Sequence, residues 1–296
     1  LIVMSDKRNI MSSKVLLTGS RGLVGSRILE KLSFIDNQIE IIAINRKKDK
    51  HYSIKKSYGF DLSDYKKLSY VLKKHKPNFV IFSSGLTNLD LIEKDKELSV
   101  KSNVIPIINF CKLSDYFDKM IYFSTDSVFD GLKGNCTAED IPRPIYIYSS
   151  HNLEAESILR KSLKNYLIYR FNVVGYNFVK DTSLLNWVIN KIKKQDFIKG
   201  FTDVIFNPIH PIQLATTIVD ELYKDYIGIR HLHLNQSFSK YEMIQSISKL
   251  IEYDLSKIIP TKSTLINLVA SRPKNTTLKS IYNNGFDYND FLSLIF

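Results

Sequence analysis

Three glycines spaced three residues apart follow the first apolar segment of the chain, and they restrict its fold more than any other feature. The segment from Lys14 to Thr18 leads directly into Gly19, Gly22 and Gly25, and apolar residues then continue at helical spacing. A glycine turn between a strand and a helix lets backbone amides approach a pyrophosphate, and the helix N-terminus adds partial positive charge. An ordinary glycine turn is the alternative interpretation. We predict a dinucleotide-binding loop made of Gly19, Ser20, Arg21, Gly22, Leu23, Val24 and Gly25.

Short apolar segments alternate with helix-length segments through the rest of the first half. We expect further strands at residues 41–44, 79–82, 120–123, 166–171 and 231–234. Such alternation is typical of a parallel sheet with helices on both faces, here a doubly wound, Rossmann-type α/β fold.

The alternation becomes less regular after about residue 175, which indicates a second and smaller lobe. We expect residues 13–175 to form the dinucleotide-binding domain. Residues 176–296 would form mainly a C-terminal substrate-binding lobe, with about 206–236 returning to the first domain. Residues 1–12 show no periodicity and are expected to be a disordered extension that contributes nothing to the fold.

Composition limits the class of protein. With 44% hydrophobic residues in 296, the chain can bury a large core, and its formal charge of +12 favours anionic partners. The two cysteines match no disulfide framework, and no apolar run approaches the ~18 residues that cross a bilayer. We therefore expect a cytoplasmic protein without a membrane partner. Because nothing resembles a base-stacking platform or a major-groove helix, we expect no nucleic-acid partner.

The residues after the second strand bear on cofactor choice. An acid that would bind the adenosine 2′-hydroxyl is absent there, and Asn45 and Arg46 follow instead. Arg46 and Arg21 can pair with a 2′-phosphate, so NADP(H) is preferred and NAD(H) remains possible. Solvated basic residues without a role are the alternative. Small residues after the fourth strand, Ser83, Ser84 and Gly85, would let the chain pass close to the cofactor.

A metal site is not expected. His231 and His233 alternate on one predicted strand, but no carboxylate or cysteine at a suitable spacing joins them. We expect edge or surface positions for both.

A second group of motifs lies between residues 122 and 156. It contains Ser124-Thr125-Asp126 at a strand end, followed by Tyr148 and, four residues later, Asn152. With the glycine loop, these motifs make the chain from Lys14 onward similar to the extended short-chain dehydrogenase/reductases of the dTDP-4-dehydrorhamnose reductase family. It also resembles the related regulatory beta subunit of methionine adenosyltransferase. Further marks of this resemblance are Thr87-Asn-Leu-Asp90, Asn103, Pro144 to Glu156, Arg170, Ser239-Lys-Tyr-Glu242 and Arg272-Pro273.

The resemblance implies roles for particular residues. Tyr148 would donate a proton to the C4 ketone of a nucleotide-linked deoxysugar while the nicotinamide supplies hydride, and Thr125 would orient that ketone. Asp126 and Arg272 would contact the sugar nucleotide. On the cofactor side the resemblance implies contacts from Asp61 and Leu62 to the adenine and from Asn152 to the nicotinamide ribose. Thr87, Asn103 and Tyr148 would also contact the cofactor, and Asn103 would support the site.

Asn152 departs from the family, which has lysine at this position. A cation ~4 Å from a tyrosine is worth about 4 kcal/mol at an effective dielectric near 20, or roughly three pKa units. Without it, Tyr148 would keep a high pKa and donate its proton less readily. Protonated His151 could replace part of this charge, or it could be a solvent-facing histidine. Ser127 stands where the family usually has tyrosine, which leaves the substrate pocket less crowded or differently shaped.

Two functions remain open from the sequence. The first is NADPH-dependent reduction of the C4 ketone of a nucleotide-activated 6-deoxyhexose, in polysaccharide or glycoconjugate synthesis, slowed by Asn152. The second is a catalytically impaired, NADP-binding regulatory or structural subunit of the same fold. The first reading implies a sugar-nucleotide substrate and a possible homodimer, and the second implies an enzyme partner. An epimerase would need tightly held NAD, which Arg46 disfavours.

Overall fold

A seven-stranded parallel sheet forms the centre of the molecule. In this computed structural model the described residues are 13–35, 39–179 and 183–295, so the predicted extension at 1–12 lies outside them. The strands are ordered β3-β2-β1-β4-β5-β6-β9, and every neighbouring pair is parallel. Their bounds are β1 Ser13–Thr18, β2 Ile39–Asn45, β3 Ile54–Gly59, β4 Phe79–Phe82, β5 Lys119–Thr125, β6 Tyr166–Phe171 and β9 Gly228–His231.

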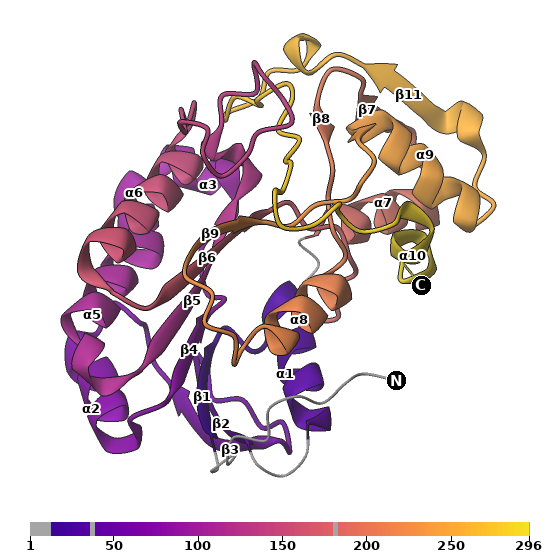
Figure 1. The fold of residues 1–296 in the computed structure, drawn as a ribbon. Coiled ribbons are helices and arrows are strands. Elements are labelled where there is room, and N and C mark those ends of the chain that lie inside the picture. The colour runs from indigo at the N-terminus through magenta and orange to yellow at the C-terminus, as the bar shows by residue number, and fades with distance from the viewer. Residues whose placement is uncertain (1–12, 36–38, 180–182, 296) are drawn as a thin grey trace.

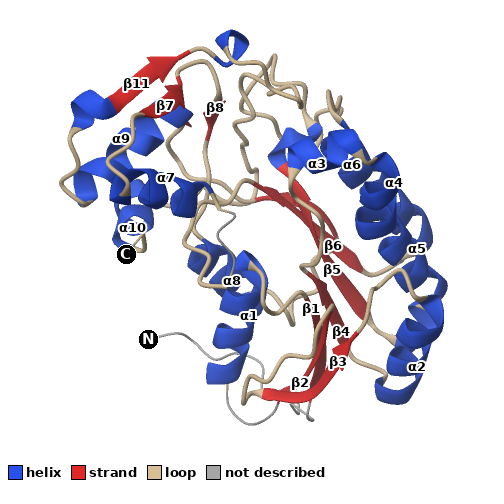
Figure 2. Ribbon diagram, turned by 180° about the vertical axis from the view of Figure 1, so that it is seen from behind, coloured by secondary structure: helices blue, strands red, loops and turns tan. Residues whose placement is uncertain are grey.

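Helices cover both faces of this sheet (Figures 1 and 2). One face packs on α2 (Tyr65–His75), α5 (Ile105–Lys112) and α6 (Ile147–Ser162), and the other on α1 (Leu23–Phe34) and α8 (Pro211–Asp220). Alternate strand residues serve the two faces: Leu16 is buried with the first set of helices, and Val15 and Leu17 with the second. The predicted doubly wound, Rossmann-type fold is confirmed.

The last strand of the sheet begins three residues earlier than expected. The predicted strand at 231–234 is wrong, because β9 ends at His231 and the Leu232 amide makes a last bond to the Arg170 carbonyl. Beyond it the chain leaves the sheet, and Leu234 forms an isolated bridge with Phe286. Segments distant in sequence bury residues 232–234, so their apolar pattern does not mark a strand of the sheet.

The two histidines of this region are both buried, so neither is at the surface, and only His231 has the expected edge position. His231 lies on the outermost strand of the sheet and is 1% exposed, and its Nδ1 is 3.0 Å from the Cys136 carbonyl oxygen. His233 is bonded to the Leu234 carbonyl and to the Ser280 amide. Among the described residues, no three or more His, Cys, Asp or Glu side chains are grouped to hold a metal ion.

The remaining elements form a separate cluster at the carboxyl side of the sheet, seen at the upper right of Figure 1. They are α7 (Leu184–Lys193), β7 (Ile198–Phe201), β8 (Ile205–Phe206), β10 (Phe238–Ser239), α9 (Lys240–Leu250), β11 (Ile258–Thr261) and α10 (Tyr288–Ser293). Their core includes Val188, Phe206, Met243 and Phe291. Between them in sequence, α8 packs against α1 and β9 joins the large sheet.

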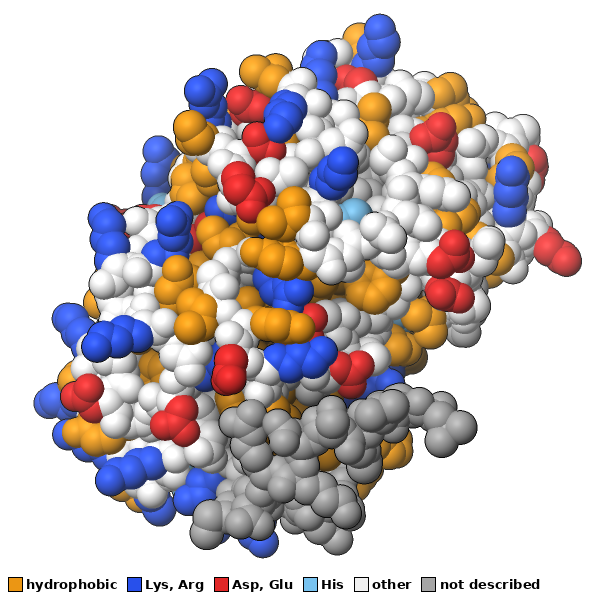
Figure 3. Space-filling model, in the orientation of Figure 1, with side chains coloured by type: hydrophobic (Ala, Val, Ile, Leu, Met, Phe, Trp, Pro, Cys, Tyr) orange, Lys and Arg blue, Asp and Glu red, His pale blue; other side chains and the backbone are white. Residues whose placement is uncertain are grey.

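Two shorter helices, α3 (Leu89–Lys94) and α4 (Lys96–Ser99), follow β4 and lead into a π-helical turn at Val100–Val104. On the face shown in Figure 3, basic side chains are scattered among acidic and apolar ones without forming a continuous band.

None of the helices in the described part of the chain combines the length and apolar character needed to cross a bilayer.

Candidate active site

A long groove follows the carboxyl edge of the parallel sheet. It consists of two cavities, of about 560 and 540 Å³, which share Gly22, Ser83, Ser84 and Gly85. The first is also lined by Gly19, Arg21, Asn45, Arg46, Asp61 and Leu62, and the second by Leu23, Val24, Thr87, Asn103, Thr125, Asp126, Tyr148, Asn152 and Arg272. The structure therefore brings together the residues that the sequence assigned separately to cofactor and substrate.

The glycine loop has the geometry of a phosphate cradle. Gly19 has φ +68°, and a Cβ there would lie 2.8 Å from the Ser83 carbonyl oxygen. A Cβ at Gly25 would lie 2.1 Å from the Gly19 carbonyl oxygen, which allows α1 to start directly against the loop. The first amides of α1 therefore face the groove beside Gly22, Leu23 and Val24. These features fit the diphosphate of a dinucleotide.

Ser20 and Gly25 line neither cavity, unlike their neighbours in the predicted loop. The Ser20 hydroxyl donates to Asp49 Oδ2 at 2.7 Å and accepts from Asn45 Nδ2 at 2.8 Å. Ser20 is thus turned into the protein, where it joins the loop to the end of β2. Asp49 was missed from the sequence, because it lies beyond the basic run and only the fold returns it to Ser20.

The cavity at the end of β2 carries basic side chains. Arg21 and Arg46 both line it and are exposed, and Asp61 lies on the same cavity with its carboxylate accepting from the Ser63 amide at 2.9 Å. Asp49, the nearest acid after β2 in sequence, is occupied by Ser20 and by the His51 amide. This end of the groove therefore suits a phosphate better than an uncharged hydroxyl.

Asn103 supports the loop that follows β4. It lies in the π-helical turn, and its side-chain amide exchanges two hydrogen bonds with the Leu86 backbone, at 2.7 and 3.0 Å. These bonds hold Gly85 and Thr87 at the groove wall. Asn103 thus reaches the groove, with its amide used for positioning the chain.

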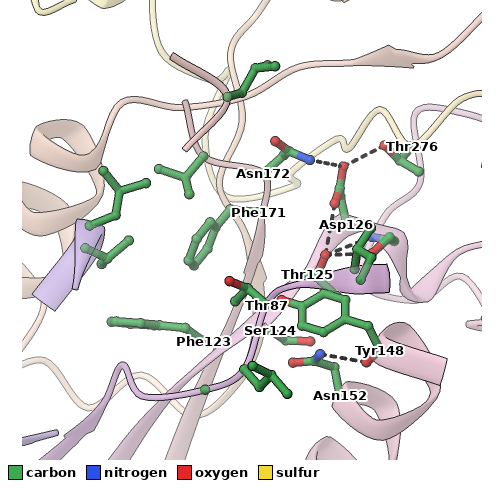
Figure 4. Close-up of a pocket in the computed structure, with 18 of the residues that line it drawn as sticks. Thr87, Phe123, Ser124, Thr125, Asp126, Tyr148, Asn152, Phe171, Asn172 and Thr276 are labelled. Carbon is green, nitrogen blue, oxygen red and sulfur yellow. Dashed lines mark hydrogen bonds between the residues drawn. The ribbon is translucent and has the colours of Figure 1, made fainter. Parts of the chain in front are cut away.

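Thr125 and Asp126 mark the end of β5. Asp126 is 2% exposed, and its carboxylate accepts from the Thr125 hydroxyl at 3.1 Å, Asn172 Nδ2 at 3.1 Å and the Thr276 hydroxyl at 2.6 Å (Figure 4). Burial raises the pKa of Asp126, and these hydrogen bonds act in the opposite direction. The Thr125 hydroxyl must turn away from Asp126 before it can donate to a substrate oxygen.

Tyr148 projects from the first turn of α6 toward Thr125 (Figure 4). Burial raises the pKa of Tyr148 to about 12, the Asp126 carboxylate adds to this shift, and Asn152 lowers it. No cation of the described chain contributes to that pKa. The phenol therefore stays protonated at neutral pH and can serve as a proton donor.

The Asn152 side chain has a partner at each end. Its Nδ2 donates to the Tyr148 carbonyl at 2.8 Å, and its Oδ1 accepts from the Tyr122 hydroxyl at 3.0 Å. Tyr122, on β5, was not expected at the site. Burial is the largest of the effects that raise the pKa of Tyr122. Its position in the apolar part of a strand gave no signal, because only the packing of α6 on β5 brings its hydroxyl to Asn152.

His151 does not replace the missing cation. Its Nδ1 lies 2.8 Å from the Ser99 hydroxyl, and burial lowers the pKa of its imidazole. His151 is therefore neutral at neutral pH, and it is partly exposed while its ring contacts α4.

Ser127 and Tyr146 lie side by side in the wall of the substrate cavity. The Tyr146 ring lines the same cavity and stacks on Tyr148, with centroids 6.3 Å apart. Burial raises the pKa of Tyr146, and a hydrogen bond with Ser127 opposes this.

A buried ion pair joins β6 to α6. Arg170 on β6 donates from Nε and Nη2 to the Glu156 carboxylate on α6, at 2.9 and 2.6 Å, and both side chains are 1% exposed. Ser124 donates to the same carboxylate. The pair connects three elements beneath Thr125 and Tyr148.

The opposite wall of the groove comes from the C-terminal cluster of elements. Arg272, predicted from the resemblance, lines it together with Lys240, which the sequence did not single out. Lys240 lies within Ser239-Lys-Tyr-Glu242, a motif recognised only as a family mark. The sequence shows a basic residue there, but it does not show that this residue lines the groove.

The sheet, the glycine loop and the Thr125–Tyr148 segment define an extended short-chain dehydrogenase/reductase fold. The family model described as RmlD substrate binding domain matches residues 13–284, and the chain belongs to this family.

The relatives of the chain include a regulatory-type subunit and a reductase, the two kinds of protein that the sequence resembles. Methionine adenosyltransferase 2 subunit beta of Rattus norvegicus is 24% identical over 93% of this chain and 83% of its own length. dTDP-4-dehydrorhamnose reductase of Salmonella typhimurium is 26% identical over 56% of this chain and 54% of its own. The crystal structure of dTDP-4-dehydrorhamnose reductase from Bacillus anthracis in complex with NADP has a TM-score of 0.85 at 21% identity, covering 96% and 99% of the two chains.

Proposed function

We propose that the chain is an NADPH-dependent reductase of the C4 ketone of a nucleotide-activated 6-deoxyhexose, working slowly because of Asn152. One observation carries the proposal: a single groove contains the glycine loop, the basic end at Arg21 and Arg46, and the proton donor Tyr148 beside Thr125. The reductase name of the structural neighbour, and its NADP, support the same chemistry.

In this proposal the glycine loop, Arg21 and Arg46 would hold NADPH, which would supply hydride to the ketone carbon. Tyr148 donates its phenolic proton to the ketone oxygen, and Thr125, once released from Asp126, donates a hydrogen bond to that oxygen. Asn152 keeps Tyr148 in place through its backbone carbonyl but supplies no charge. The high pKa of Tyr148 makes the proton transfer less favourable, which accounts for a slow reaction.

A second candidate is a regulatory subunit that binds NADP without turnover. Two observations favour it: the Asn152 amide is used within the protein, and the methionine adenosyltransferase beta subunit matches 93% of the chain. In this reading the groove serves as a binding site, and an enzyme is the partner.

A titration followed by a turnover assay separates these proposals. NADPH and NADH are titrated against the protein by fluorescence, and dTDP-4-dehydrorhamnose is then added while oxidation is followed, with Tyr148→Phe as the control. Slow oxidation that Tyr148→Phe abolishes supports the reductase. Tight NADPH binding without oxidation, across a panel of 4-keto sugar nucleotides, supports the regulatory subunit, and failure to bind either cofactor rejects both.

A further inference from the structure

Lys240 is held at the wall of the substrate cavity by its neighbours. It is the first residue of α9, directly after Ser239, which forms a capping box with Glu242. Its backbone amide donates to the Val204 carbonyl at 3.0 Å, and its Nζ lies 3.2 Å from the centroid of the Phe206 ring. Both ends of the residue are thus anchored on the β8 segment, and the side chain lines the cavity that contains Thr125 and Tyr148.

The amine of Lys240 lacks a polar partner in the described part of the chain, where it makes neither a hydrogen bond nor an ion pair. Asp126 is near enough to influence it, but the Asp126 carboxylate already accepts from Thr125, Asn172 and Thr276. Arg272 lines the same cavity and donates from Nη1 to the Ala270 carbonyl at 2.6 Å. The cavity therefore holds two basic side chains and one carboxylate whose hydrogen bonds are already made.

The charge state of Lys240 is sensitive to what occupies the cavity. Burial lowers the pKa of Lys240 to about 7, with Arg272 acting in the same direction and the Asp126 carboxylate opposing it. The phenols of Tyr146 and Tyr148 line the same cavity. Because an adjacent anion favours the charged form of an amine, an acidic ligand would raise this pKa and draw a proton from solution.

We propose that Lys240 and Arg272 form an anion-binding pair that takes the acidic group of the substrate. The group is either the diphosphate of a nucleotide or a carboxylate on the sugar. The inference rests on the proposed function of the groove, and it adds Lys240 as a residue that determines substrate specificity. A lysine that only balanced Asp126 would be expected to contact its carboxylate, whereas the Lys240 ammonium lies over the Phe206 ring in the cavity wall and has no hydrogen bond or ion pair among the described residues.

Calorimetry with defined probes tests the pair. Thymidine, dTDP and glucuronate are titrated into the full chain at about one pH unit above the pKa of Lys240, in two buffers of different ionisation enthalpy. We expect dTDP or glucuronate, but not thymidine, to bind with proton uptake. Lys240→Met should weaken that binding by about 10-fold and abolish the uptake. Lys240→Arg should keep the affinity and lose the uptake, because arginine stays charged.

Lys249→Met is the matched control, since Lys249 is exposed on the same helix and carries the same charge. Whichever of dTDP and glucuronate shows the loss in Lys240→Met identifies the source of the anion. Equal binding by wild type and Lys240→Met, or uptake that persists in Lys240→Arg, would overturn the inference. NADPH titration of each variant reports folding: a wild type that binds NADPH but neither acidic probe contradicts the proposed substrate class as well. If Lys240→Met loses NADPH binding, that variant is misfolded, and the proton uptake of Lys240→Arg alone tests the inference.

Discussion

At the scale of single residues, Asn152 connects two tyrosines rather than leaving a gap. Its amide joins the Tyr148 carbonyl to the Tyr122 hydroxyl, so the first turn of α6 remains fixed on β5. What is lost relative to a lysine is charge, since an amide donates hydrogen bonds but carries no cation. Asn152 can therefore hold Tyr148 in position, but it cannot lower the pKa of Tyr148 as a cation would.

Restoring the cation tests that distinction. We expect Asn152→Lys to raise the rate of ketone reduction by about 10-fold to 1000-fold, because a nearby ammonium lowers the pKa of Tyr148. The Tyr122 hydroxyl can turn to accept from the new ammonium. Asn152→Met, of similar length and uncharged, is the control in steady-state assays. An equal gain in both variants would show that charge is not the cause.

The pH dependence of kcat follows from the protonation state of Tyr148. Reduction needs protonated Tyr148, and with a pKa of about 12 the phenol keeps its proton as pH rises through the neutral range. We expect kcat at saturating substrate to stay level up to about pH 10, and to fall at lower pH in Asn152→Lys, where the pKa is reduced. We choose kcat rather than kcat/KM because the titration of Lys240 would affect substrate binding, which no longer limits the rate at saturating substrate. A wild-type kcat that falls near neutral pH would contradict this assignment.

Arg46 should decide between the two nicotinamide cofactors. It lines the cavity at the end of β2 with Arg21, where a 2′-phosphate would lie. We expect Arg46→Ala to raise the Kd for NADPH by about 10-fold and to leave that for NADH nearly unchanged. Arg160→Ala removes the same charge from an exposed site on α6 and serves as the control. Equal weakening of both cofactors by Arg46→Ala would remove the basis for the NADPH preference.

At the scale of elements, the start of α1 depends on the absence of a side chain at Gly25. A Cβ there would lie 2.1 Å from the Gly19 carbonyl oxygen, whereas a Cβ at Gly22 would lie 3.2 Å from the same atom. The strand β1, the loop and α1 therefore fit together only with glycine at position 25.

This difference gives a matched pair of variants. Gly25→Ala should destabilise the fold by about 1–3 kcal/mol and abolish NADPH binding, because α1 must shift away from the loop. Gly22→Ala should lower the free energy of unfolding much less. Urea unfolding and fluorescence titration measure both effects, and similar losses in the two variants would argue against this packing.

At the scale of the whole molecule, the groove lies between parts with different cores. The cofactor end is lined almost entirely by residues before 107, and the core around Phe291 belongs to the C-terminal cluster of elements. We propose that the chain divides near residue 175, with α8 and β9 belonging to the first part.

A pair of core truncations tests this division. Phe291→Ala and Phe110→Ala each remove a fully buried ring, from the C-terminal core and from the sheet core respectively, at a cost of about 3–5 kcal/mol. We expect Phe291→Ala to weaken dTDP binding while NADPH binding persists, and Phe110→Ala to weaken NADPH binding. Equal loss of both ligands in both variants would show one cooperative unit.

The parallel sheet and the glycine loop could be predicted from the amino-acid sequence, because both depend on local spacing, whereas Tyr148 was assigned through the family resemblance. Alternating burial and glycine positions report backbone geometry within a few residues. The strands β4 and β6 accordingly have the predicted bounds, and the predicted loop starts at the carboxyl end of β1.

The polar groups that face the groove could not be predicted from the sequence and became evident in the folded chain. Ser20 turns inward to Asp49, Tyr122 reaches Asn152, and Lys240 and Arg272 line the same cavity. Each of these relations joins segments that are far apart in the chain. Local sequence patterns carry no signal for them, because the direction of a side chain is set by the elements that pack against it.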